Sequence, residues 1–263
     1  RFFMAVGKSV SSKAVFCIDA PVQPQFIRIS FFMALFTTLY SGSSGNCALI
    51  LHEGKYLLID MGKSCRTTLN ALRSLGLAVS DSEGILITHD HSDHVSGLDT
   101  FFKHGRTEDI GTFRVSSFPT SHDVPCCGYR VTTPDGHIMA LATDLGVLTP
   151  VVQANLAGCS LVALEANYVS CSLHGGPYPY YLKVRIASDR GHLDNRACAA
   201  ELLDLIQDGC KKSALCHLSQ TNNSPELALT TVYKVLLATG IQPGRDELIQ
   251  SQSRNEVSPY IEI

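Results

Sequence analysis

Four metal-binding side chains crowd into one short stretch of the sequence. The run His89-Asp90-His91-Ser92-Asp93-His94 places three imidazoles and a carboxylate within six residues, directly after the apolar run 84–88. Neutral imidazole and carboxylate groups are ligands of zinc and related first-row ions. A His/Asp-rich surface loop without metal is the alternative, but the complete H-x-H-x-D-H string behind a buried strand favours the metal. The run therefore predicts a metal-dependent hydrolase.

Three further candidate ligands stand at the ends of other apolar runs. Asp144 ends one predicted strand, His122 ends another, and His217 follows the buried segment 213–216. We expect these strand ends to meet the histidine run at one edge of the sheets. The alternative for each is a hydrogen-bonded polar group of the core or the surface.

Short apolar runs and alternating patterns, bounded by turn residues, predict the elements that position these side chains. Strands are expected at 35–40, 48–52, 56–60, 84–88, 113–118, 129–132, 137–143, 160–165, 213–217 and 259–263. Helices are expected at 65–75, 195–207 and 224–238. A strand-rich opening followed by alternating strands and helices favours layered sheets covered by helices on both sides.

The run and its surroundings resemble a known family. H-x-H-x-D-H behind a buried strand resembles the metallo-β-lactamase superfamily, an α+β fold built as an αββα four-layer sandwich. Further motifs in the expected order make residues 33–263 similar to its YycJ (WalJ) branch, cytoplasmic hydrolases associated with 5′-to-3′ exonuclease activity on DNA. These motifs are Ser41-Gly42-Ser43-Ser44-Gly45-Asn46, His122-Asp123, Thr143-Asp144-Leu145-Gly146, Tyr178-Pro179 through Leu182-Lys183-Val184-Arg185-Ile186, Gly191-His192-Leu193-Asp194-Asn195, and His217-Leu218-Ser219 with Asn222-Asn223.

The resemblance implies two divalent metal ions, with zinc expected first and manganese or iron as alternatives. The ligands of the first ion would be His89, His91 and His122, those of the second Asp93, His94 and His217, with Asp144 bridging both. Two such ions would supply a bridging hydroxide as nucleophile. Asp93 would also be catalytic, because its carboxylate can orient the attacking water.

Glu165 and His192 are the implied proton donors, because they are similar in placement to a Glu/His pair in the ribonuclease Z branch. A histidine paired with a carboxylate is held in one tautomer and has a raised pKa, which suits general acid catalysis. The alternative is that His192 is a structural residue at the start of a helix.

Substrate phosphate is expected to contact a small-residue loop and nearby basic and amide side chains. The candidates are Ser41, Ser43, Ser44, Asn46, Lys183, Arg185, Arg190, Asn195, Asn222 and Asn223. Backbone N–H groups of small residues can approach an anion closely, and lysine and arginine add local positive charge. An ordinary solvated turn and helix face is an equal alternative, and Asn222 and Asn223 could instead orient His217.

Composition limits the class of protein. The chain has 263 residues, 45% hydrophobic and 17% charged, with a formal net charge of −3. These values favour one folded domain over disorder and exclude a globally basic nucleic-acid binder. Ten cysteines without a C-x-x-C pair indicate reduced thiols of a cytoplasmic protein. No apolar run is long enough to span a membrane, and the sequence leaves the oligomeric state open.

The first 32 residues lack helical or strand periodicity, and regular patterning begins after Met33. We expect residues 1–32 to be a non-native or unstructured extension and residues 33–263 to form the hydrolase domain. A secretory signal within this stretch is the alternative, although its apolar part is interrupted and no typical cleavage site follows.

Two departures from the family pattern affect substrate selection. Tyr168-Val169 follows Asn167 where the family usually has His-Asp, and the stretch from Leu98 to Gly111 is unusually short. The short stretch predicts an exposed sheet edge or a more open active-site wall. A phosphodiesterase acting on nucleic acid, DNA more than RNA, is the leading prediction. The alternatives are a small-molecule ester or thioester hydrolase and a catalytically silent metal-binding protein.

Overall fold

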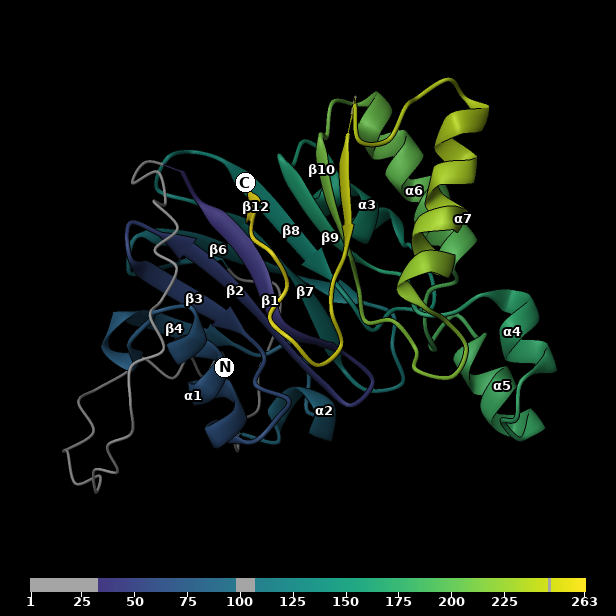
Figure 1. Cartoon of the computed structure of the whole chain (residues 1–263), viewed down its shortest axis with the longest axis horizontal. Helices are drawn as coiled ribbons and strands as arrows, with labels where there is room; N and C mark the ends of the chain where they lie inside the picture. The colour runs from purple at the N-terminus through teal and green to yellow at the C-terminus, as the bar shows by residue number, and fades with distance from the viewer. Residues whose placement is uncertain (1–32, 98–106, 246) are drawn as a thin grey trace.

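Two β-sheets lie face to face, and helices cover the outer face of each, as Figure 1 shows. The computed structural model describes residues 33–97, 107–245 and 247–263. The expected extension 1–32 and most of the short stretch after the histidine run lie outside these residues. The layers confirm the predicted αββα sandwich.

The first sheet is built mainly from the beginning of the chain. Its order is β12 (Ile261–Glu262), β1 (Leu35–Gly42), β2 (Gly45–His52), β3 (Lys55–Ile59) and β4 (Ser82–Leu86). Strands β1, β2 and β3 are antiparallel neighbours, whereas β3 and β4 run parallel. The helix α1 (Cys65–Ser74) makes the crossover between those two parallel strands, and its buried Leu72 packs on this sheet.

The second sheet contains the rest of the described strands. Its order is β11 (Leu248–Ser251), β10 (Lys212–Cys216), β9 (Leu161–Glu165), β8 (Ile138–Ala142), β7 (Cys126–Thr132), β6 (Phe113–Thr120) and β5 (Thr107–Ile110). The strands from β8 to β11 are parallel. Strand β9 is buried along its whole length, as parallel strands covered on both faces require. At the opposite edge, β5 pairs only with β6 among the described strands.

Most of the core lies between the sheets and beneath the second layer of helices. Phe36, Ile50 and Met139 are among the buried side chains between the sheets. The outer face of the second sheet packs against the helices α3 (Pro150–Leu156), α6 (Asn195–Gln207) and α7 (Pro225–Ala238). Figure 1 shows the short helices α4 (Ser170–Gly175) and α5 (Tyr180–Ile186) standing apart from the sandwich at one side.

Every strand and helix expected from the sequence has a counterpart in the structure. The elements without a prediction are α2 (Ser92–Val95), α3, α4, α5, β5, β11 and a 3-10 turn at Val79–Asp81. All are seven residues long or shorter, too short for hydrophobic periodicity to stand out. No helix within the described residues is long and apolar enough to cross a membrane. The nine cysteines of this part of the chain are free thiols.

Candidate metal centre

Side chains from both sheets converge at one end of the sandwich. Six imidazoles form a contiguous group, in which the centroids of neighbouring rings lie 4.0–5.6 Å apart. The group consists of His89, His91, His94, His122, His192 and His217. Asp93 and Asp144 lie among these rings. The structure thus brings together all seven residues that the sequence nominated as metal ligands.

The three histidines nominated for a first ion form one compact set. Donor atoms of His89, His91 and His122 all lie within 4.8 Å of one another. Nε2 of His89 and Nε2 of His122 are buried and have no hydrogen-bond partner. An unpaired buried nitrogen is costly, so these atoms fit a cation that they would coordinate.

The residues nominated for a second ion form an adjoining set. Donor atoms of Asp93, His94 and His217 also lie within 4.8 Å of one another. Asp144 stands between the two sets. Its Oδ2 is 3.2 Å from His94 Nε2, and its Oδ1 is 3.9 Å from His122 Nε2. Imidazole and carboxylate donors around two adjoining points fit first-row divalent ions.

Hydrogen bonds on the far side of the rings fix which nitrogen faces the centre. His94 Nδ1 donates to Asp60 Oδ2 over 2.7 Å, and His122 Nδ1 donates to the carbonyl of Gly191 over 3.0 Å. Asp60 is itself held by Thr88, whose backbone N–H donates to Oδ1 over 2.8 Å. Such contacts turn Nε2 of each ring toward the centre, where it could bind an ion. Sequence analysis gave Asp60 no role in the site, although a carboxylate at the end of the buried strand β3 could have indicated one.

Three residues of the site have left-handed backbone conformations. The φ angles are 65° at Asp60, 58° at Asp144 and 54° at His217. Each residue follows the end of a strand, β3, β8 or β10, by one or two positions. Such conformations are uncommon outside glycine and are tolerated best by Asp, Asn and His. The backbone therefore turns sharply where it delivers each of these polar side chains.

Burial and neighbouring charges set the protonation of the donors. Burial, reinforced by nearby His94, lowers the pKa of His89 to about 2, so that its imidazole is neutral. Burial opposes ionisation of Asp144, but His217 and His94 outweigh it and hold its pKa well below the usual range. Burial would lower the pKa of His217, but Asp144 raises it to about 9. Asp144 therefore carries a negative charge at the centre, which fits a cation, and His94 and His217 would release their protons on binding one.

Glu165 and His192 form a pair beside the metal ligands. His192 Nδ1 lies 2.7 Å from Glu165 Oε1, and the other carboxylate oxygen accepts the N–H of Leu145 over 3.1 Å. The His192 ring centroid is 5.2 Å from that of His122. Burial disfavours the charged imidazole, but the charge of Glu165 and the hydrogen bond to it raise the pKa of His192. This geometry can hold a proton next to the centre.

The small-residue loop divides into two parts. Ser43 and Ser44 are exposed, and Ser43 lines a cavity of about 160 Å³ together with His122 and His192. Ser41 is buried, and its Oγ accepts the N–H of His217 over 3.0 Å. The Asn46 amide nitrogen is likewise buried, 3.0 Å from His94 Nε2 and 3.3 Å from Asp93 Oδ2. Only the exposed part of the loop lies free to meet a substrate.

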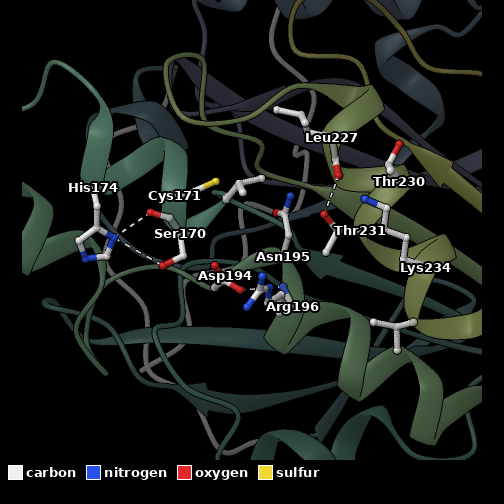
Figure 2. Close-up of a pocket in the computed structure, with 12 residues that line it drawn as sticks. Ser170, Cys171, His174, Asp194, Asn195, Arg196, Leu227, Thr230, Thr231 and Lys234 are labelled. Carbon is white, nitrogen blue, oxygen red and sulfur yellow. Dashed lines mark hydrogen bonds between the residues drawn. The ribbon is translucent and has the colours of Figure 1, made fainter. Parts of the chain in front are cut away.

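The structure does not bring Asn195, Asn222 or Asn223 to the lining of this cavity. The Asn195 amide donates to Asn223 Oδ1 over 3.0 Å, and the Asn223 amide donates to the carbonyl of Ala166 over 2.8 Å. Asn195 lines a separate cavity of about 640 Å³ between α4, α6 and α7, which Figure 2 shows. Asn222 is buried, and its carbonyl accepts the N–H of Val169. These amides connect the loops after β9 and β10.

The nominated cations differ in where they lie. Arg185 lines the metal cavity and forms an ion pair with Asp123, to whose Oδ2 its Nε donates over 2.9 Å. Arg190 donates to the carbonyls of His122 and Asp123. Lys183 donates to the carbonyl of His174 over 2.7 Å and lines an outer cavity instead.

Asp123 is a site residue to which sequence reasoning gave no role. Its Oδ1 lies 3.4 Å from His91 Nε2 and 3.3 Å from His122 Nε2, while its Oδ2 holds Arg185. Burial opposes its ionisation, but the hydrogen bond from Arg185 lowers the pKa of the carboxyl. Its position next to the predicted ligand His122 was the feature of the sequence that could have indicated a role in the site.

The sandwich and the converging donors define a class of protein, the metal-dependent hydrolases of the metallo-β-lactamase fold. The fold matches the metallo-β-lactamase fold protein YhfI of Bacillus subtilis with a TM-score of 0.63. That match has 13% sequence identity and covers 86% of this chain and 99% of YhfI. A family model described as Anti-Pycsar protein Apyc1 matches residues 36–110, which hold the first β-strands and the histidine run.

Two curated relatives span most of the chain. Exodeoxyribonuclease YycJ of Bacillus anthracis is 31% identical over 241 residues, which are 80% of this chain and 91% of the relative. Exodeoxyribonuclease WalJ of Streptococcus pneumoniae is 29% identical over 262 residues, covering 87% of this chain and 97% of the relative. The chain belongs to the YycJ/WalJ family.

Proposed function

We propose that this metal-dependent hydrolase is a 5′-to-3′ exonuclease that acts on DNA and holds two divalent ions, with zinc as the preferred metal. The observation that carries the proposal is the pair of adjoining donor sets that share Asp144, with the His192–Glu165 pair beside them. The names of the curated relatives, both exodeoxyribonucleases, support the choice of polymer. The nine free thiols support a reducing, cytoplasmic location.

In this proposal the two donor sets hold one ion each. The first ion would be bound by His89, His91 and His122, the second by Asp93, His94 and His217, and Asp144 would bind both. When bound, two such ions supply a hydroxide nucleophile at neutral pH and neutralise charge that grows on the phosphate.

The protein's own side chains direct the reaction. Asp93 is half-buried at the mouth of the centre and accepts a hydrogen bond from the attacking water, which aims its lone pair at phosphorus. As the phosphorus–oxygen bond breaks, protonated His192 donates its proton to the leaving oxygen. Glu165 keeps His192 protonated and oriented through the 2.7 Å contact.

The substrate phosphate lies against the walls of the 160 Å³ cavity. Ser43 and Arg185 line it, and Ser44 is exposed beside Ser43. These three residues are our proposed phosphate contacts. Ser41, Asn46, Asn195 and Asn223 are instead proposed to position the loops around the centre, because they are buried and their side chains bond to protein groups. Asn222 is proposed to do so through its carbonyl, which accepts the N–H of Val169.

The proposal is tested with end-labelled polymers. The metal-loaded protein is incubated with DNA and with RNA of the same sequence, each labelled at the 5′ or the 3′ end. We expect stepwise release of nucleotides from the 5′ end of DNA, and its loss in His91→Ala. Faster cleavage of RNA would reassign the polymer, and hydrolysis of thioesters or β-lactams alone would reassign the class of substrate. Bound metal without turnover of any of these would contradict an enzymatic role.

A further inference from the structure

Helix α5 holds two aromatic rings in solvent. Tyr180 is 82% exposed and Tyr181 is 74% exposed, more than any other large apolar side chain among the described residues. Tyrosine rings normally bury most of their surface, so a neighbouring pair in water needs an explanation. Figure 1 shows that α5 stands apart from the sandwich together with α4.

The helix lies between two cavities. Leu182, Arg185 and Ile186 line the cavity of the metal centre, whereas Tyr180 and Lys183 line an outer cavity of about 640 Å³. Tyr181 precedes Arg185 by four residues, so the two residues are neighbours on one face of the helix, with their Cβ atoms roughly 6 Å apart. A polymeric substrate that leaves the metal cavity past Arg185 would therefore meet the tyrosine rings next.

The charge of this segment suits a polyanion. Residues 170–187 contain Lys183 and Arg185 and no aspartate or glutamate, although Arg185 forms an ion pair with Asp123 outside this segment. The Lys183 ammonium donates to a carbonyl, which leaves its charge uncompensated by that contact. Exposed aromatic rings interleaved with cations are typical of surfaces that bind single-stranded nucleic acids, since the rings stack on bases while the cations attract phosphates.

We infer that α5 is a base-stacking platform for single-stranded nucleic acid. Tyr180 and Tyr181 stack on bases of the same strand whose scissile phosphodiester lies at the metal centre. The inference rests on the proposed nuclease function and adds to it the form of the substrate. Paired bases in a duplex hide their faces, so the platform selects a strand that is single-stranded beside the cleaved bond.

The first experiment removes the rings and measures affinity and turnover separately. Fluorescence anisotropy with a labelled, phosphorothioate-protected oligodeoxythymidylate gives the affinity of the metal-loaded protein. We expect binding about tenfold weaker in Tyr180→Ala or Tyr181→Ala and about a hundredfold weaker in the double variant. Hydrolysis of bis(p-nitrophenyl) phosphate, which is too small to reach Tyr180 or Tyr181 from the metal cavity, stays unchanged. The control is Leu237→Ala, which removes a side chain that is 57% exposed on α7.

The second experiment uses the absence of tryptophan from the chain. Tyr180→Trp creates a single tryptophan, which is excited selectively at 295 nm and keeps an aromatic ring on the platform. We expect near-normal affinity and quenching of its fluorescence by the oligonucleotide, whereas the control Leu237→Trp is not quenched.

The outcomes separate the platform from the proposed function. Unchanged oligonucleotide affinity in the double alanine variant overturns the platform, even if the wild type degrades DNA as proposed. Ring-dependent binding without any cleavage supports the platform and overturns the nuclease. Loss of binding to anionic lipid vesicles, with oligonucleotide affinity intact, would assign the rings to a membrane surface and overturn the platform as well.

Discussion

The imidazoles of the centre owe their orientation to residues that would not touch a metal ion. Asp60 is buried, accepts a hydrogen bond from His94 Nδ1 and is fixed by Thr88. The carbonyl of Gly191 does the same for His122. These contacts decide the tautomer of each ring and so decide which nitrogen faces the ion.

Asp60→Asn should therefore weaken metal binding without removing a proposed ligand. Asparagine tolerates the left-handed φ of 65°, so the change removes mainly the charge that holds His94. We expect about 10- to 100-fold weaker binding at the second ion, measured as metal content after dialysis against a competing chelator. Asp81→Asn is the control, because among the described residues the Asp81 carboxylate contacts only Lys55 and the N–H of Ala78 and none of the metal ligands. Equal metal content in both variants would contradict this role.

Glu165→Gln should shift the pH dependence of catalysis. Glu165 raises the pKa of His192, and His192 must be protonated to act as the acid. The rate is therefore full below that pKa and falls as the pH rises through it. Without the carboxylate the pKa drops, so the alkaline limb of kcat/KM moves to lower pH. A pH profile on a small phosphodiester, at equal metal content, tests this; an unmoved limb would remove His192 as the donor.

The ligands could be predicted at this scale because they form a dense motif and stand at the ends of strands. Asp60 and Asp123 could not, because their roles depend on contacts between segments far apart in the chain. Asp60 meets His94, and Asp123 meets both His91 and Arg185, 62 residues away. Burial likewise separates Ser41 from Ser43, although the two stand in one motif.

At the scale of elements, a close backbone approach joins the loop after β3 to α2. A Cβ at Gly62 would lie 1.6 Å from the carbonyl oxygen of Asp93 and 2.6 Å from the backbone nitrogen of Asn46. Only glycine allows the three segments to meet here. Long, strongly patterned strands and helices such as β1 and α6 could be predicted from sequence. The pieces α4 and α5 could not, because Gly175, Gly176 and two prolines interrupt any periodicity.

Gly62→Ala should push α2 away from the loop that carries Asn46. We expect a loss of about 1–3 kcal/mol of unfolding free energy, together with reduced metal content, because α2 carries Asp93 and His94. Chemical denaturation followed by circular dichroism measures the first, and metal analysis the second. Gly175→Ala is the matched control, since nothing lies within 4 Å of its Cβ position. Similar losses in both variants would argue against a specific contact.

At the scale of the whole molecule, the proposed ligands are divided between the two sheets. The histidine run follows β4 of the first sheet, whereas His122, Asp144 and His217 follow strands of the second. Bound ions would therefore tie the sheets together at this end. The proposal thus links metal binding to the stability of the entire sandwich.

Removal of metal should lower the melting temperature. A ligand present at 100 times its Kd stabilises the folded state by about 2.7 kcal/mol. For a domain of this size that amounts to a shift of roughly 5–10 °C. Calorimetry of the loaded and the chelator-treated protein measures the shift, and re-addition of zinc should restore it. An unchanged melting temperature would mean that the ions do not hold the sheets together.

The left-handed conformations of Asp60, Asp144 and His217 have a consequence for how these positions can vary. Folding alone would accept Asn or Gly at all three and reject valine or isoleucine, whereas catalysis would accept far fewer residues. A mutational scan that measures protein abundance and activity separately should therefore find two different sets of tolerated residues at these positions. Variants that remain abundant but inactive, such as Asp144→Asn, would yield a folded protein in which the reaction has been switched off.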